Sequence, residues 1–350
     1  MAKMKREDVG KISLAMGSGG LETSHLLEKL VFGRVPAPLK TVENGLGIDF
    51  PDDSAAIPLN DRTFLVVSVD AYTVNPLVFP GGDLGSLAAA GTINDVLMLG
   101  GRPFAALDSI VVEEGLEYSM LERVFDSMVD VFAAENVKLV GGDFKVMPRG
   151  QLDQMIVATT GIGFAEKIIA DKNLSAGDKI IVSGTVGEHG AAVLAAQHRF
   201  ESTEFRSDVR PLTNLMKPLL DEHIRYIDAA RDPTRGGLSM VLHDWARSSN
   251  LSIFIDEAEI PLREPVSALC EMMGIDPLSL ATEGVAVLAV KPEAAEQVLE
   301  TIHSSGFRDA KIIGEARPNI RDVSFVVMKT LIGGYRVLEP PTGEIVPRIC

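Results

Sequence analysis

The stretch Arg231-Asp232-Pro233-Thr234-Arg235-Gly236-Gly237-Leu238 is the most distinctive part of the second half of this 350-residue chain. The residues after it follow a helical pattern through Trp245, so the glycine pair is predicted to open a helix. Backbone N–H groups at the N-terminus of a helix attract anions. We therefore expect these N–H groups and Asp232 to converge at that helix end.

Several acidic residues in the first half of the chain lie at positions where functional side chains are often found. Residues 64–69 predict a buried strand that ends at Asp70, where α/β proteins place functional side chains. Asn94 and Asp95 lie in an apolar helix predicted over 84–99, and burying them without partners would cost several kcal/mol. This pair either caps something locally or binds a ligand or metal. Asp52 and Asp53, taken alone, favour a solvated turn or a helix cap.

Two glycine-rich stretches are candidate phosphate contacts. Met16-Gly17-Ser18-Gly19-Gly20 can turn backbone N–H groups towards a phosphate, although a flexible arm is equally compatible with it. A short strand predicted over 137–140 leads into Gly141-Gly142-Asp143-Phe144-Lys145. The acid and the lysine after two glycines make this stretch a candidate binding site for a metal ion and a phosphate. Thr282-Glu283-Gly284 precedes a strand at 285–290, which puts an acid at the edge of that strand.

The remaining pattern predicts an alternation of strands and helices. We expect helices over 21–32, 118–135, 191–196, 212–230, 237–245 and 264–273. The strand that contains the apolar run 64–69 is expected over 62–69, and further strands are expected over 104–112, 155–163, 180–182, 253–255 and 311–314. His189 has no metal-ligand partner at a suitable spacing, and Cys270 lies beside Leu269 and Met273, so both are interpreted as structural.

The amino-acid composition argues against several classes of protein. Apolar residues make up 46% and charged residues 23%, which is typical of a soluble globular chain, and we expect no membrane span and no secretory signal. The two cysteines form no CxxC or Cys/His cluster, which indicates a reducing compartment and no zinc site. The formal net charge of −16 argues against nucleic acid but allows a nucleotide whose phosphates are bridged to carboxylates by a cation.

The C-terminal segment 331–350 is rich in glycine and proline and predicts an extended, mobile tail. Fully extended, the part from Gly333 to Cys350 spans at most ~60 Å. A thiol at the end of such an arm can be loaded at one protein and processed at another site. Read alone, Cys350 is more often an idle terminal residue.

These motifs together resemble the ATP-dependent family of aminoimidazole ribonucleotide synthetases and selenophosphate synthetases, in register over nearly the whole chain. Within that family, the loop Pro80-Gly81-Gly82 and the terminal Pro347-Arg348-Ile349-Cys350 are similar to the carbamoyl dehydratases of hydrogenase maturation. The chain departs from the residues usual in that family at Ala71, where Ser or Gly is common, and at Phe144, where Thr is common. Phe144 would remove a hydroxyl next to the expected phosphate site.

The resemblance implies an α/β (α+β) fold with two domains of the aminoimidazole ribonucleotide synthetase type. The expected parts are an arm and helix over 1–40, an ATP-binding and dimerisation domain over 41–165, an α/β domain over 166–330 and the mobile tail over 331–350. The first domains of two copies are expected to pair in a homodimer, with ATP near the interface.

The resemblance also implies the site residues. Mg²⁺ is expected on four positions: Asp52 or Asp53, Asp70, Asp95 and Asp232. Cofactor contacts are expected from Gly17, Ser18, Gly19, Gly20, Asn94, Asp143, Thr234, Arg235 and Gly236. The catalytic candidates are Cys350, Lys145 and Glu283. Glu283 stands outside the metal set and suits a general base, and Lys145 suits a fixed positive charge; a surface ion pair is the alternative for these two residues.

The implied reaction is the ATP-dependent dehydration of a carbamoyl group on the Cys350 sulfur to a thiocyanate. A carbamoyltransferase would load the thiol, and an iron-scaffold maturation complex would accept the cyanide for a [NiFe] hydrogenase. A cytoplasmic homodimer without nucleic-acid or membrane partners is expected. Two rivals are a selenophosphate-synthetase-like enzyme, which usually has Cys or selenocysteine in the arm that here reads Met16–Gly20, and a carrier whose tail thiol only binds metal.

Overall fold

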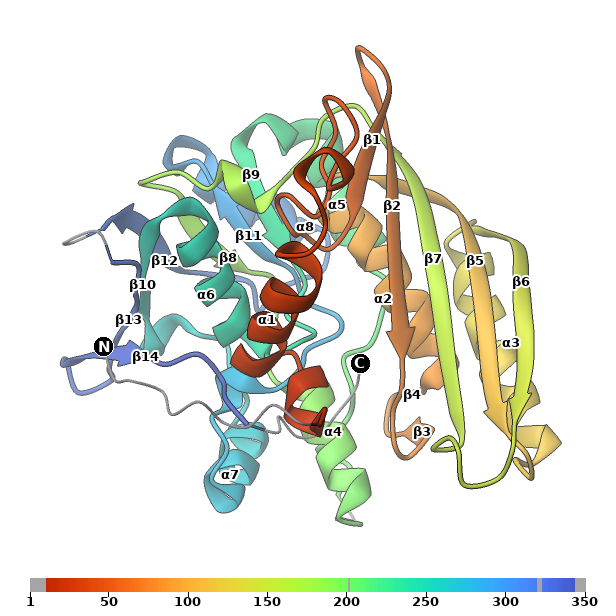
Figure 1. Ribbon diagram of the computed structural model, residues 1–350. Helices are drawn as coiled ribbons and strands as arrows, with labels where there is room; N and C mark the ends of the chain where they lie inside the picture. Colours follow the sequence, from red (N-terminus) through yellow and green to blue (C-terminus); the bar gives the residue numbers. More distant parts are fainter. Residues whose placement is uncertain (1–10, 201, 320–322, 344–350) are drawn as a thin grey trace.

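The computed structural model describes residues 11–200, 202–319 and 323–343, and most of its strands form two sheets on either side of helix α2 (Figure 1). The first sheet has the order β1-β2-β7-β5-β6 and is antiparallel except for the parallel pair β5/β6. Its strands are β1 (Ala55–Asn60), β2 (Thr63–Tyr72), β5 (Arg102–Glu113), β6 (Lys138–Met147) and β7 (Met155–Ala165). Helices α2 (Leu84–Met98) and α3 (Tyr118–Ala134) cover one face of it.

The second sheet has seven strands in the order β14-β13-β10-β12-β8-β11-β9. They are β8 (Lys179–Val182), β9 (Ile227–Arg231), β10 (Leu251–Asp256), β11 (Val287–Val290), β12 (Lys311–Pro318), β13 (Val326–Lys329) and β14 (Tyr335–Leu338). The helices of this half are α4 (Glu188–Gln197), α5 (Thr213–Pro218), α6 (Gly237–Ser249), α7 (Glu264–Met273) and α8 (Ala295–Ser304). The mixture of helices and sheets confirms the predicted α/β class.

The short elements lie mostly in the arm and in connections. They are α1 (Leu21–Leu27), the two-residue strands β3 (Val78–Phe79) and β4 (Gly82–Asp83), the π-turns Glu28–Phe32 and Leu219–His223, and the 3-10 turns Leu14–Gly17, Ala37–Leu39, Asp171–Asn173, Ile224–Tyr226, Glu257–Glu259, Pro277–Ser279 and Pro292–Ala294.

Helix α2 joins the two halves and presents polar residues at their junction. Asp83 caps it by accepting from the backbone N–H groups of Gly85 and Ser86, and the Ser86 hydroxyl accepts from the Asp83 N–H. Its small residues let neighbours approach closely: a Cβ on Gly85 would stand 1.8 Å from a backbone oxygen of α3. All residues of α2 except Ser86 are buried. Asn94 and Asp95 are therefore held inside the protein, as the sequence predicts.

One hydrophobic core runs through both halves, from Tyr72 and Leu87 of the first to Leu212 and Leu288 of the second. Asn94 pins this junction, because its side chain donates to the carbonyls of Arg210 (3.2 Å) and Glu283 (3.1 Å) and accepts from the N–H of Leu212 (2.8 Å). The two halves are therefore held in a fixed relation at the site described below.

Several strands differ from the sequence-based expectation. The strand predicted to end at Asp70 continues to Tyr72, so Asp70 lies within β2 opposite Thr159. The stretch Gly141–Lys145, expected as a loop after a short strand, is part of β6 because pairing with β5 continues to Met147. Strands β1 and β9 were not predicted, and β9 replaces the end of the helix expected over 212–230. Sheet pairing, which local pattern does not record, decides these segments.

The tail is ordered further than expected. Residues 335–338, predicted to be part of a mobile tail, form β14 because they pair with β13, with Val327 opposite Val337. The backbone of Pro341 then accepts from the Leu21 N–H (3.0 Å). Residues 344–350, and with them Cys350, lie outside the described residues.

Candidate active site

Carboxylates from both halves converge beside the N-terminus of α6. Asp53 precedes β1, Asp70 lies on β2, Asp95 lies on α2, Asp232 follows β9 and Glu283 precedes β11. Burial raises the pKa of Asp95 well above its ordinary value, and the charges of Asp232, Asp70 and Asp53 raise it further. Burial likewise raises the pKa of Glu283 well above its usual range, with Asp232 as the largest charge acting on it. We call these five side chains the acidic site.

Two arginines offset part of this negative charge. The Arg231 Nε lies 3.2 Å from Asp53 and 3.2 Å from Asp171, without hydrogen-bond geometry to either, so these contacts are electrostatic. Its Nη1 bonds to Asp244 at 3.2 Å. Arg235 Nη2 lies 3.6 Å from Asp70. Arg231 is thus a buried cation behind the acidic site, whereas Arg235 is half exposed at its mouth.

Several buried oxygens of the acidic site have no hydrogen-bond partner among the described residues. They are Asp53 Oδ2, Asp232 Oδ2 and both carboxylate oxygens of Glu283, whose side chain is fully buried. A buried carboxylate without a partner is costly unless it is protonated or meets a cation. A set of carboxylate oxygens is also the donor set that Mg²⁺ prefers. The chemistry of the acidic site therefore fits Mg²⁺.

The geometry for a metal is not preset. Within residues 11–200, 202–319 and 323–343, no three His, Cys, Asp or Glu side chains already stand where they could hold one ion. Asp52 and Asp53, which the sequence left open as alternatives, have different surroundings. Asp52 accepts from the N–H groups of Asp53 (2.9 Å) and Asp171 (3.0 Å), whereas Asp53 faces Arg231 and the other acids.

The glycine-rich arm closes over the N-terminus of α6. A Cβ on Gly19 would stand 2.6 Å from the Cβ of Arg235, and one on Gly236 would stand 3.1 Å from the Gly19 carbonyl oxygen. Gly236 has φ +67°, a left-handed conformation that glycine adopts without strain. The arm residues Gly17, Ser18 and Gly20 and the neighbouring Thr234 were predicted to contact a cofactor. The structure places the arm beside the N-terminus of α6 through Gly19, and the cofactor contacts stay a prediction.

Asp143 and Lys145 lie away from the acidic site within one chain. The sheet places Asp70, Thr159, Asp108 and Gly142 in one row across β2, β7, β5 and β6. Three strand spacings of about 4.8 Å put β6 ~14 Å from β2. Both residues are exposed on this edge strand, and the structure does not bring them to the other predicted residues.

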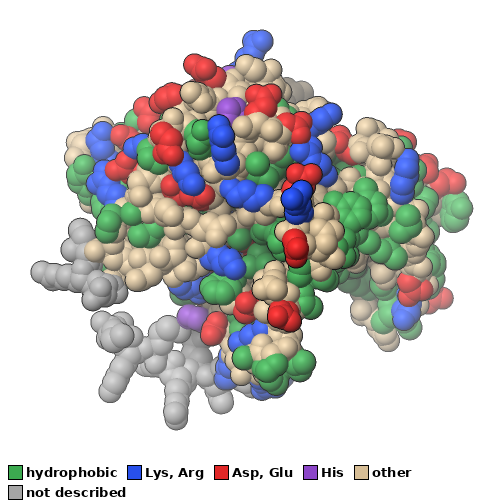
Figure 2. All heavy atoms as spheres, turned by 90° about the horizontal axis from the view of Figure 1, so that it is seen from above, with side chains coloured by type: hydrophobic (Ala, Val, Ile, Leu, Met, Phe, Trp, Pro, Cys, Tyr) green, Lys and Arg blue, Asp and Glu red, His purple; other side chains and the backbone are tan. Residues whose placement is uncertain are grey.

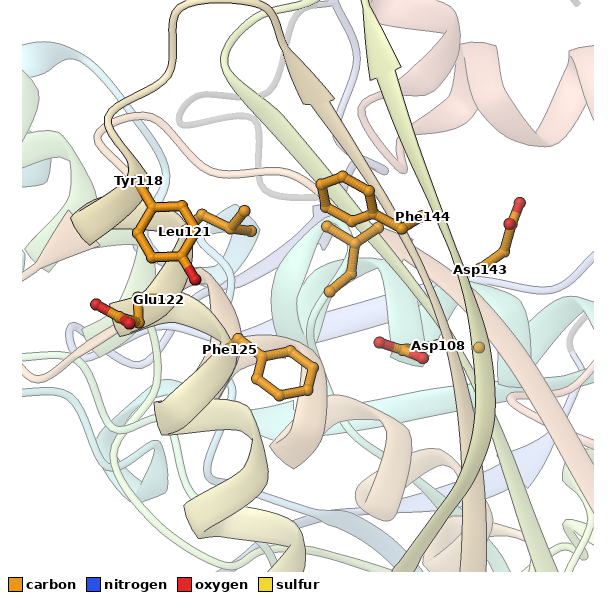
Figure 3. A pocket seen from close by; sticks show the side chains of 9 residues that line it. Asp108, Tyr118, Leu121, Glu122, Phe125, Asp143 and Phe144 are labelled. Carbon is orange, nitrogen blue, oxygen red and sulfur yellow. The ribbon is translucent and has the colours of Figure 1, made fainter.

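Phe144 does not occupy the position that the sequence suggested. It points into a cavity of about 460 Å³ between β6 and α3, with Tyr118, Leu121 and Phe125, while Asp143 points away from this cavity (Figure 3). Successive residues of a strand face opposite sides, so a change at 144 acts on the helix side of the sheet. Within one chain, Phe144 therefore lies beside α3 and not beside the acidic site.

Comparison with known proteins identifies the family. The models of AIR synthase related proteins match residues 175–326 with the C-terminal domain and 51–165 with the N-terminal domain. The carbamoyl dehydratase HypE of Rhizobium leguminosarum bv. viciae is 37% identical over 97% of this chain and 95% of its own length. The chain belongs to the carbamoyl dehydratase HypE family.

Solved structures of HypE proteins share the fold. A HypE in complex with ATP matches with a TM-score of 0.78 at 35% identity, over 97% of this chain and 100% of that one. A HypE–HypF complex contains a chain that matches with a TM-score of 0.81 at 35% identity, over 90% and 99% of the two chains. The fold of this HypE family member is thus the aminoimidazole ribonucleotide synthetase type that its motifs predicted.

The sequence did not reveal the residues that support the acidic site of this HypE family member. Asp171 receives the Trp245 Nε1–H at 2.5 Å and lies against Arg231. Asp208 receives the backbone N–H groups of Glu283 (3.2 Å) and Gly284 (2.8 Å). Arg231 adjoins Asp232 in the quoted motif and could have been singled out there, but Asp171 and Asp208 carry no local signal. His189 and Cys270 are buried among core residues, as expected.

Proposed function

We propose that this chain dehydrates a carbamoyl group carried on its own Cys350 sulfur to a thiocyanate, with ATP as co-substrate and Mg²⁺ at the acidic site. The observation that carries the proposal is the convergence of five carboxylates from both halves, three of them with buried oxygens that lack a partner in the described chain. The HypE family membership and a HypE relative solved with ATP support it.

Residue roles follow from position. Asp53, Asp70, Asp95 and Asp232 would hold Mg²⁺, and Asp53 is preferred over Asp52 because the Asp52 oxygens already accept backbone N–H groups. When bound, Mg²⁺ neutralises phosphate charge and ATP supplies the phosphoryl group that turns the carbamoyl oxygen into a leaving group. The arm Gly17–Gly20, Thr234, Arg235 and Gly236 would enclose the phosphates and exclude water.

Glu283 is the proposed general base. The carbamoyl nitrogen loses both of its protons as the C–O bond breaks and the C≡N bond forms, so a proton acceptor must lie within reach of it. Both Glu283 oxygens are buried and without partners among the described residues, so neither must give up an existing hydrogen bond to accept a proton. Its burial beside Asp232 raises its pKa, which strengthens it as a base.

The course of the tail supports delivery of the thiol to this site. Gly343, the last described residue, donates its N–H to Glu22 (3.1 Å), and its carbonyl accepts from the Ser18 hydroxyl (3.2 Å). Ser18 belongs to the arm that covers the acidic site. Cys350 is the seventh residue after Gly343, which gives a reach of at most ~25 Å from this anchor.

A homodimer would complete the site. Apolar side chains gather over the first sheet, on the right-hand part of Figure 2. Exposed ones include Val69, Leu107 and Phe164, which by strand alternation lie opposite to the face where Thr159 meets Thr92 of α2. Such a surface is typical of an interface. In the order β1-β2-β7-β5-β6, the two edges carry β1 and β6, so a two-fold-related copy that joins the opposite edges brings Lys145 and Asp143 of that copy towards Asp70.

The partners are proposed on chemical grounds. A carbamoyltransferase must load the thiol, and a solved complex of a HypE relative with HypF supports a stable loading partner. An iron-scaffold maturation complex would accept cyanide for the [NiFe] centre. In the described part of the chain no helix has the length and apolar character needed to cross a bilayer. We keep the cytoplasm as the proposed location and residues 41–165 and 166–330 as the proposed domains.

The test is single-turnover conversion of preloaded carbamoyl-Cys350, followed by the mass of the C-terminal peptide. Wild type should show loss of water from the carbamoyl group only with Mg²⁺ and ATP, and Cys350→Ala should accept no carbamoyl group. Glu283→Gln should accept the group and bind ATP but dehydrate it at least ~100-fold more slowly. Wild-type rates in Glu283→Gln would remove that residue from the mechanism, and carbamoyl label on Cys350→Ala would remove the carrier thiol.

A further inference from the structure

A second cavity, of about 320 Å³, lies in the second half of the chain, where β8 passes into α4. Its walls carry four arginines, Arg206, Arg210, Arg263 and Arg308, in a protein whose formal net charge is −16. The acidic site, whose Glu283 donates its backbone N–H to Asp208 of the cavity wall, has the opposite charge. The chemistry of this cavity is therefore not that of the proposed reaction.

The four arginines differ in whether they already have a partner for their charge within the chain. Arg263 pairs with Glu188 (2.9 Å), and Arg210 donates to the Gly284 carbonyl (3.2 Å) while its guanidinium lies 4.4 Å from the centre of the Phe307 ring. Arg206 and Arg308 make no ion pair or hydrogen bond with any residue that the structure describes. Two guanidinium groups thus remain available at one cavity.

Of the three acidic residues in the wall of the cavity, Asp208 and Glu188 already bond other residues of the chain. Asp208 accepts the backbone N–H groups of Glu283 and Gly284. Glu188 is 3% exposed and bonds Arg263 through one oxygen, while its other oxygen has no partner among the described residues. Burial raises the pKa of Glu188, while the charge of the paired Arg263 lowers it. Asp309, which is exposed, is the acid in the wall that opposes an anion.

The backbone adds further donors. Gly184 and Thr185 lie in the turn between β8 and α4, and their N–H groups meet no acceptor in the described part of the chain. Glu188 is the first residue of α4, so the positive end of this ten-residue helix faces the cavity. Free backbone N–H groups, a helix N-terminus and unpaired guanidinium groups are the features with which proteins hold phosphate.

We propose that this cavity binds a phosphate-class anion, either inorganic phosphate or the phosphoryl group of a small molecule. Arg206 and Arg308 hold its charge from the rim, and the N–H groups of Gly184 and Thr185 bond its oxygens from the floor. No divalent cation is needed here, in contrast to the acidic site, whose carboxylates repel phosphate unless a cation bridges them. The proposal stands independently of the dehydration reaction.

The test uses full-length protein in EDTA, so that the acidic site cannot hold phosphate through a cation. Thermal unfolding is followed in 0–20 mM inorganic phosphate and, separately, AMP, with chloride added to constant ionic strength. The midpoint phosphate concentration of the rise in Tm should be at least about tenfold higher in Arg206→Ala/Arg308→Ala, because two charge-assisted contacts are lost. The matched control Arg34→Ala/Arg62→Ala removes two exposed arginines of the first half and should keep the wild-type midpoint, as should Asp232→Asn.

The outcomes separate the two ligand sources. An AMP response that is tighter than that of phosphate, and that depends on the same arginines, identifies a phosphorylated small molecule. A response to phosphate without a tighter AMP response identifies the free ion. Equal midpoints in Arg206→Ala/Arg308→Ala and in the control would overturn the site, and so would a rise in Tm that chloride alone reproduces.

Discussion

Asp52 and Asp53 are neighbours in sequence and have opposite surroundings. Two backbone N–H groups occupy the Asp52 carboxylate, and burial raises the pKa of Asp52 to about 7. Asp53 lies in electrostatic contact with Arg231, and its Oδ2 has no partner among the described residues. The side chain that keeps a free oxygen is the one suited to bind a cation.

A matched pair of variants tests this difference. Asp53→Asn should weaken Mg²⁺-dependent ATP binding at least about tenfold, because one ligand charge is lost. Asp52→Asn keeps one acceptor oxygen for the backbone and should change ATP affinity less than about threefold. Calorimetric titration with MgATP measures both. The reverse order of effects would assign the metal contact to Asp52 instead.

His189 gives a second residue-scale prediction, through pH. Burial lowers the pKa of His189 to about 3, while its Nδ1 shares a hydrogen bond with the Ser207 hydroxyl (2.7 Å). The unfolded chain takes up this proton near pH ~6.5 and the folded protein does not, so the contribution of this group to stability is full above that pH and falls as pH drops towards 3. The slope should be about 1.4 kcal/mol per pH unit.

Urea unfolding of wild type and His189→Gln at pH 7.5 and pH 5.5 measures this slope. The buried carboxyl groups with raised pKa values act in the opposite direction, so the informative quantity is the difference between the two proteins. Wild type should lose about 1.4 kcal/mol more than His189→Gln on acidification. An equal loss in both would show that His189 does not titrate on unfolding.

At the scale of elements, the start of α6 depends on glycine. Gly237 has φ +60°, and a Cβ there would stand 2.5 Å from the Leu278 carbonyl oxygen and 2.6 Å from that of Leu280. Gly274, at the end of α7, has a similar φ of +68° but nothing within 4 Å of the same position. The two glycines therefore share the backbone requirement and differ in crowding.

Replacing each glycine by alanine separates these two effects. Gly274→Ala should cost about 1 kcal/mol of unfolding free energy, the strain of a left-handed alanine. Gly237→Ala should cost at least about 2 kcal/mol more, because the backbone at 278–280 must also move. Urea unfolding measures both values. Equal costs for the two variants would mean that the backbone at 278–280 moves away from the new Cβ without a measurable loss of stability.

The elements also show what sequence can predict. Helices with a clear period, such as α3 and α7, and strands with buried apolar runs, such as β7, were predicted closely. Strand β9 (Ile-Asp-Ala-Ala-Arg) has little β-propensity and forms because it pairs with β11. The motifs marked Asp70, Asp95, Asp232 and the pair Asp52/Asp53, whose carboxylates lie near one another in the structure, but they did not decide between Asp52 and Asp53. The exposure of Asp143 and Lys145 on the far edge depends on strand order, which no local motif encodes.

At the scale of the whole molecule, the separation of Lys145 from the acidic site gives the proposed dimer a direct test. If each site combines the acids of one chain with Lys145 of the other, Lys145→Ala and Asp232→Asn homodimers should both be nearly inactive. Mixing them in equal amounts should restore about a quarter of wild-type activity, because half of the dimers are mixed and each holds one intact site. Lys145→Ala mixed with itself is the control. No recovery in dimers shown by mass to have exchanged would place Lys145 in its own chain's site or outside the mechanism.

The hydrogen bonds of Gly343 to Ser18 and Glu22 also set the effective concentration of the Cys350 thiol near the arm. A thiol only seven residues beyond a fixed point is confined to a small volume, which corresponds to an effective concentration on the order of 10 mM. If Cys350 carries the carbamoyl group as proposed, the acidic site meets this group at a concentration that does not depend on the amount of protein. A small thiol in solution would need millimolar amounts to compete, so the tether itself is a source of selectivity.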